Sequence, residues 1–193
     1  FARALKNDPK LVEERFRFCT NYTLTVFKAY ADCGAKIFLE GGDIAHKGGP
    51  MINPKYFNEF LLPCYKEVSE QIHDWGGKYI LHTDGDVTDL LDFIVECGFD
   101  GLQCLELPYV DPYHVKKKVG DKLCLSGNID TRYILVDANK DEVEKAVKNA
   151  IKALGHSGGF MLSPANFHPS ISPERLKWMI ETTLKFGKYP LKI

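Results

Sequence analysis

The stretch GGKYILHTDGD, residues 76–86, contains the unit that decides the fold. Its two glycines follow a helical pattern, and glycine readily takes the left-handed conformation that ends a helix. A short apolar run comes next and finishes in polar side chains, among them His82 and Asp84. A short apolar run without strict alternation is typical of a strand buried on both faces, as in a parallel sheet.

The same unit recurs on both sides of this stretch. It is found toward the N-terminus at residues 33–40 and toward the C-terminus at residues 97–106, 120–128 and 158–163. Strands that alternate with helices predict a parallel α/β fold, and both a doubly wound sheet and part of a barrel satisfy the pattern. No glycine-rich phosphate-binding motif follows any of these strands, which argues against a nucleotide site.

Helical patterns fill the segments between the strands. Asn53-Pro54 and Ser172-Pro173 each combine an N-cap with proline at the first helical position. Thr88 is expected to cap another helix. Apolar residues at helical spacing or flanking signals predict helices over residues 9–32, 54–72, 88–95 and 140–154, and a last one from residue 173.

Composition narrows the classes of function. The chain has 193 residues, of which 45% are hydrophobic and 26% charged, with a formal net charge of −1. This balance gives no sign of a nucleic-acid partner, and no apolar stretch is long enough to cross a bilayer or to act as a signal peptide. We expect a cytoplasmic protein whose residues 1–193 form one α/β domain. Since Phe1 replaces an initiator Met and the length falls short of a complete barrel, a piece of a longer chain is expected.

Polar side chains follow each strand, where the chemistry of parallel α/β folds collects. Six of them are candidates for a shared site: Asp43, His82, Asp84, Glu106, Asn128 and His168. Each also has a structural interpretation. Asp43 could cap a turn, His82 could be a hydrogen-bonded core histidine, and the others could be solvated or hold their loops.

Metal binding is one use of these side chains. His82 and Asp84 are two residues apart and so lie on the same strand face. Together with Glu106 and Cys104 they offer enough donors for a metal site, although Cys104 and Glu106 share a face only if their strand is regular. The six cysteines form no CxxC pair, and the alternative is that all are buried thiols.

Four segments resemble, in order, motifs of the uroporphyrinogen decarboxylase-like superfamily. Residues 42–66 resemble its GDD-x-G-P-x-I-x-P-x-x-F-x-E-F-x-x-P-x-Y-K stretch, and residues 82–87 its H-x-C/D-G-N segment. Residues 126–130 resemble its G-N-[IL]-D strand end, and residues 163–174 its last-strand pattern. The resemblance spans most of the chain and implies the C-terminal five strand-helix units of a (β/α)8 TIM barrel.

The resemblance implies one of two chemistries. Decarboxylases of the family remove carboxylates from the acetate side chains of a tetrapyrrole in porphyrin metabolism, without a cofactor. Methyltransferases of the family move methyl groups between a corrinoid protein and a small substrate. Their thiol-using members hold zinc with the H-x-C pair and a later cysteine. The Asp43-Ile44-Ala45 pattern favours the methyltransferase branch.

Two departures from the family pattern bear on the metal. Asp84 stands at the motif's cysteine, and Ala165 stands where the last-strand cysteine or histidine is expected. A thiolate zinc site is therefore not reproduced. Zinc held by His82, Asp84 and Glu106 would instead suit an oxygen-bearing substrate.

The leading hypothesis is a methyltransferase in which His82, Asp84 and Asp43 are catalytic. Glu106, Asn128 and His168 would bind substrate, and a corrinoid protein would dock over the barrel mouth. Tetrapyrrole decarboxylation and a non-catalytic binding barrel are the alternatives. The exposed sheet edges of such a piece also favour association of copies.

Overall fold

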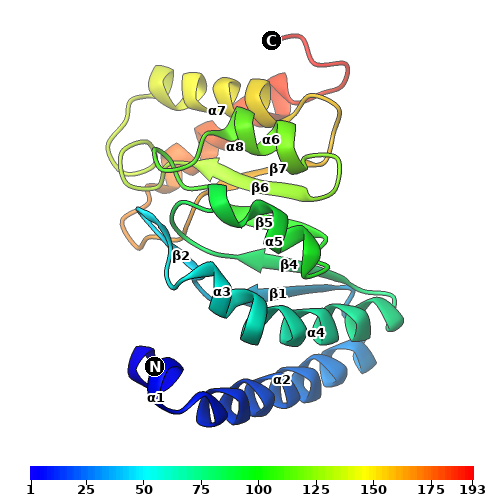
Figure 1. The fold of residues 1–193 in the computed structure, drawn as a ribbon. Coiled ribbons are helices and arrows are strands. Elements are labelled where there is room, and N and C mark those ends of the chain that lie inside the picture. The colour runs from blue at the N-terminus through cyan, green and yellow to red at the C-terminus, as the bar shows by residue number, and fades with distance from the viewer.

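Five parallel strands form one sheet, in which they lie side by side in the order of the sequence. The computed structural model describes residues 1–193, apart from the side chain of Ala2. The sheet order is β1-β4-β5-β6-β7 (Figure 1). The strands are β1 (Ile37–Gly41), β4 (Lys78–His82), β5 (Gly101–Cys104), β6 (Cys124–Ile129) and β7 (Phe160–Pro164). The expected parallel sheet of five strand-helix units is confirmed.

Helices connect these strands, largely where the sequence predicts them. The chain opens with α1 (Ala2–Asn7) and α2 (Pro9–Asp32), and closes with α7 (Lys140–Leu154) and α8 (Pro173–Phe186). Between β1 and β4 lie a small hairpin and a helix with a π-helical turn. These are β2 (Ala45–His46), β3 (Gly49–Pro50), α3 (Pro54–Tyr56), η1 (Phe57–Leu61) and α4 (Leu62–Asp74). None of the described helices combines the length and the apolar character that crossing a membrane requires.

The two remaining connections differ from expectation. After β4, a 3-10 turn, η2 (Thr88–Leu90), precedes α5 (Leu91–Glu96). The predicted Thr88 cap is wrong, because Thr88 is the first residue of η2 and no side chain caps α5. Helix α6 (Pro112–Val119) was not predicted, since consecutive lysines hide its short apolar stripe. Its start nevertheless carries a signal, because Asp111 caps it before a proline.

The sheet is covered by helices on one face and open on the other. Tyr79, Leu81 and Leu125 are fully buried in the main core beneath the helices. Neighbouring helices along the chain, such as α6 and α7, pack against one another to form this outer layer. Ile37 and Leu39 alternate with buried Phe38 along β1 and are 66% and 55% exposed, so they mark the open face.

Asp100 joins the elements at the end of the sheet where the strands begin. Its carboxylate accepts hydrogen bonds from Tyr79 N at 2.9 Å and from Lys78 Nζ at 2.7 Å, and it lies 2.7 Å from His73 Nε2. Burial alone raises the pKa of Asp100, but these three partners outweigh it and lower the pKa below the usual 3.8. Asp100 therefore fixes α4, β4 and the start of β5 together.

We expect Asp100→Asn to destabilise the fold by about 1–2 kcal/mol at pH 7, allowing for solvent screening of a partly exposed carboxylate. A carboxyl group with a lowered pKa stabilises the fold above its unfolded-state pKa, and this contribution disappears as pH falls through the folded-state value. Urea unfolding at pH 7 and at pH 3 checks the prediction. The difference between wild type and variant should shrink at pH 3, and an equal difference at both would contradict it.

Candidate functional site

Three side chains converge where β1 and β4 end. Asp43 lies two residues beyond β1, His82 is the last residue of β4, and Asp84 follows two residues later. One ligating atom from each lies within 4.8 Å of the others, with Asp43 exposed and the other two half-buried. The predicted convergence of these three residues at the strand ends is thus present in the structure. We call Asp43, His82 and Asp84 the acceptor cluster.

His82 presents its Nε2 atom to the cluster. Its Nδ1 atom is hydrogen-bonded to Gln103 Oε1 on the adjacent strand β5. An amide oxygen can only accept, so this bond requires a proton on Nδ1, and in the corresponding tautomer the lone pair lies on Nε2. Nε2 lies 3.7 Å from Asp84 Oδ1, which is too long for a hydrogen bond.

Asp84 is held by two neighbours from distant parts of the chain. Asn166, in the loop after β7, donates from Nδ2 to both Asp84 oxygens at 3.0 and 2.9 Å. Cys104 Sγ donates to Asp84 Oδ1 at 3.1 Å. Sequence reasoning did not select Gln103 or Asn166. Their places among the polar residues that follow predicted strands were the available signal.

Cys104 donates a hydrogen bond to this site and is not a member of the acceptor cluster. Its side chain is fully buried, and burial, followed by the hydrogen bond to Asp84, raises the pKa of its thiol well above the usual range. A raised pKa keeps the thiol protonated in the metal-free site, where it donates to Asp84. The expectation that all six cysteines are buried is wrong: Cys97 and Cys104 are buried, Cys64 and Cys124 are half-buried, and Cys19 and Cys33 are exposed.

Hydrogen bonds connect the loops that follow β1, β4 and β5. Asp84 N donates to Asp43 Oδ1 at 2.9 Å, Gly85 N to Glu106 Oε2 at 3.1 Å, and Ile44 N to Thr83 Oγ1 at 3.0 Å. Gly85 also has a φ of +85°, and a Cβ atom there would lie 2.5 Å from the backbone of His46. Only glycine fits this contact without displacement.

The other predicted residues lie outside the acceptor cluster. Glu106 accepts a hydrogen bond from Gly85 N and lies outside the cluster, whose third member is Asp43. Asn128 is buried beside α6 and α7, and its Oδ1 has no partner among the described residues. His168 is exposed, and its Nδ1 accepts from Ser170 N at 3.2 Å. Substrate binding by these three residues stays a prediction.

The cluster suits a cation with nitrogen and oxygen ligands. Its members face one another with acceptor atoms, and none of the described Lys or Arg side chains pairs with them. A tetrahedral ion with ligands at about 2.1 Å separates them by about 3.4 Å, close to the 3.7 Å between His82 Nε2 and Asp84 Oδ1. A thiolate zinc set does not fit, because Cys104 is outside the group of clustered ligand atoms and Ala165 offers no donor. Zinc or a harder divalent ion held by Asp43, His82 and Asp84 does fit.

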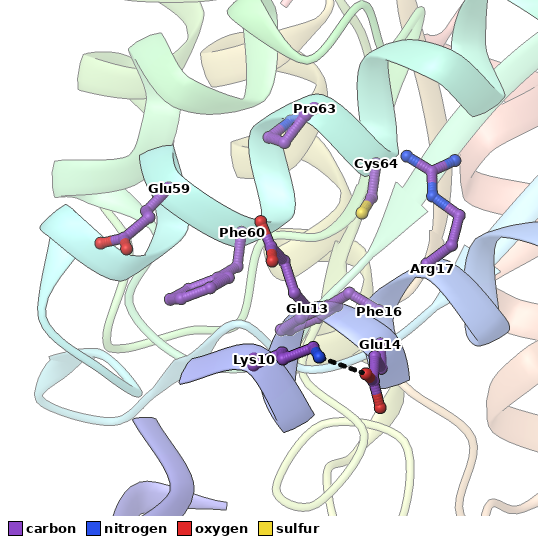
Figure 2. Close-up of a pocket in the computed structure, with 9 residues that line it drawn as sticks. All are labelled: Lys10, Glu13, Glu14, Phe16, Arg17, Glu59, Phe60, Pro63 and Cys64. Atoms are coloured by element: carbon purple, nitrogen blue, oxygen red, sulfur yellow. Dashed lines mark ion pairs between the residues drawn. The ribbon is translucent and has the colours of Figure 1, made fainter. Parts of the chain in front are cut away.

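A separate pocket lies between α2 and the start of α4. Its volume is about 540 Å³, and its rim mixes acidic and basic side chains around Phe16 and Phe60 (Figure 2). Lys10 and Glu14 in this rim form an ion pair. None of the lining residues belongs to the acceptor cluster, so this pocket is distinct from the candidate site.

The chain is similar in sequence to two kinds of enzyme. The sequence profile of the family "Uroporphyrinogen decarboxylase (URO-D)" matches residues 1–186. The methylcobamide:CoM methyltransferase MtaA of Methanosarcina barkeri is 25% identical over 142 residues, covering 74% of this chain and 40% of MtaA. The uroporphyrinogen decarboxylase of Vesicomyosocius okutanii subsp. Calyptogena okutanii is 25% identical over 114 residues, covering 58% of this chain and 29% of the relative.

A solved structure supports the fold assignment. A methyltransferase from Methanosarcina mazei superimposes with a TM-score of 0.83 at 20% identity, over 97% of this chain and 53% of its own. The chain thus spans about half of this methyltransferase and less than half of the two curated relatives.

Proposed function

Because the chain belongs to the uroporphyrinogen decarboxylase family, we propose that it is part of an enzyme that transfers a methyl group between a small oxygen-bearing substrate and a corrinoid on a partner protein. The observation that carries the proposal is the acceptor cluster of Asp43, His82 and Asp84. Imidazole and carboxylate ligands favour a divalent ion that in turn prefers oxygen over sulfur.

The proposed step is displacement at the methyl carbon of a methoxyl group. A reduced corrinoid on the partner protein would accept the methyl group and be oxidised by two electrons, while the electron pair of the broken carbon–oxygen bond stays on the substrate oxygen. That oxygen then takes a proton from water. A bound divalent ion would supply Lewis-acid stabilisation of the charge that develops on the oxygen.

The chain's own residues hold this arrangement. Asp43, His82 and Asp84 would bind the ion, and Asn166 and Cys104 orient the Asp84 carboxylate. Glu106 stands beside the cluster through its bond to Gly85 N and is proposed to contact the substrate. His168, in the loop after β7, is proposed as a second substrate contact.

Electrostatics favours methyl transfer over tetrapyrrole decarboxylation. A tetrapyrrole with several acetate and propionate groups is a polyanion. Asp43, Asp84 and Glu106 gather negative charge at the strand ends, and no described Lys or Arg pairs with them. Such a site repels a polyanion and attracts a metal cation.

We expect the whole protein to bind one divalent ion and to form methylcobalamin from cob(I)alamin and a methoxylated donor. Metal analysis gives the first result, and the change in cobalamin absorbance gives the second. Absence of both, with methylcobalamin also inert toward alcohols and thiols, would refute the proposal. Carbon dioxide release from uroporphyrinogen would support the decarboxylase alternative instead.

A further inference from the structure

We propose that Gln103 and Asn166 are positioning residues, which fix the two partly buried members of the acceptor cluster for binding a divalent ion. This inference rests on the ion site of the proposed function. Gln103 orients His82, and Asn166 orients Asp84. The two amides come from β5 and from the loop after β7, so the fold places one support at each of these two ligands.

Gln103 determines which nitrogen of His82 is available. His82 and Gln103 are partners in the parallel register of β4 and β5, so their side chains emerge from the same face of the sheet. The bond between His82 Nδ1 and Gln103 Oε1 requires the proton on Nδ1 and leaves Nε2 to face Asp84. Without this acceptor, the ring can rotate or move its proton to Nε2, and Nε2 would lose its ability to bind an ion.

Asn166 determines the plane of the Asp84 carboxylate. One amide nitrogen donates to both oxygens, at 3.0 and 2.9 Å, which restrains rotation of the group better than a single bond. Each carboxylate oxygen can accept more than one bond, so the cluster side of Asp84 stays available to a cation. Mutation of a residue that hydrogen-bonds to a metal ligand typically lowers metal affinity by about 10- to 100-fold.

The test is the zinc affinity of the whole protein, measured by calorimetric titration. The variants are Gln103→Leu, Asn166→Leu and Gln103→Glu. We expect the two leucine variants to weaken zinc binding by about 10- to 100-fold each. Gln103→Glu should bind zinc at least as tightly as wild type, because a carboxylate oxygen accepts the same Nδ1 proton. Gln71→Leu, at the other glutamine of the chain and exposed on α4, is the control and should bind zinc as wild type does.

Nitrogen NMR of the metal-free protein gives a second reading that does not depend on zinc. His82 should carry its proton on Nδ1 in wild type and in Gln103→Glu, and should shift toward the Nε2 form in Gln103→Leu. Wild-type zinc affinity in both leucine variants, or a proton on Nε2 in the wild type, would overturn the inference and leave the proposed function standing. Wild-type protein that binds no divalent ion would instead overturn the ion site and this inference together.

Discussion

His82→Ala is expected to abolish divalent-ion binding and methyl transfer in the whole protein while leaving it folded. The side chain supplies the nitrogen of the acceptor cluster, and the carboxylates of Asp43 and Asp84 alone would repel each other. We expect ion affinity to fall by more than about 100-fold, beyond the effect of losing a supporting residue. The ring is 24% exposed and outside the core, so the melting temperature should change little. Calorimetric titration with zinc, the cobalamin assay and thermal unfolding give the three measurements.

His156→Ala serves as the control, because His156 is exposed in the loop after α7. It should match wild type in all three measurements. If His82→Ala kept full ion affinity and full activity, the acceptor cluster would not be the catalytic site. If His82→Ala lost ion binding but neither the wild type nor any variant showed turnover, the non-catalytic binding barrel would be favoured.

Gly85→Ala is expected to give a large loss of stability, roughly 2–5 kcal/mol. The positive φ of +85° is strained for alanine, and the new Cβ atom would lie 2.5 Å from the carbonyl carbon of His46. The loop must therefore move, and it carries both Asp84 and the Gly85 N–H that binds Glu106. We expect weaker ion binding together with the lower stability, as measured by zinc titration and urea unfolding.

Gly34→Ala separates the two causes. Gly34 has a similar φ of +94°, but a Cβ atom there meets nothing within 4 Å. It should cost about 1–2 kcal/mol from backbone strain alone and leave ion binding unchanged. Equal losses in the two variants would show that contact with His46 has no part in the effect.

The fold and the centre of the site were predictable because both depend on periodic features. Glycine, apolar run and polar strand end recur along the chain, and parallel strands bring those ends together. Asp43, His82 and Asp84 follow strands that are neighbours in the sheet, so their convergence needed only the correct strand order. Helix α2 was predicted over its observed span because its apolar pattern is long and its proline start is clear.

The surroundings of the cluster depend on local backbone geometry that no pattern encodes. Cys104 and Leu105 have φ values of 114° and 51°, so the alternation that would have oriented Cys104 and Glu106 ends with β5. Asn166 reaches Asp84 from 82 positions along the chain, through a loop without regular structure. Irregular backbone after β5 and after β7 therefore explains why the sequence did not reveal the positions of Glu106 and Asn166 relative to Asp84.

The cross-loop bonds have a consequence for how the site can be observed. The amide protons of Ile44, Asp84 and Gly85 are all donated to side chains of neighbouring loops. Exchange with deuterium at these amides then requires the loops to separate, so their rates should rise and fall together. These three amides thereby report on the assembly of the loops at the strand ends in the absence of any substrate, ion or partner.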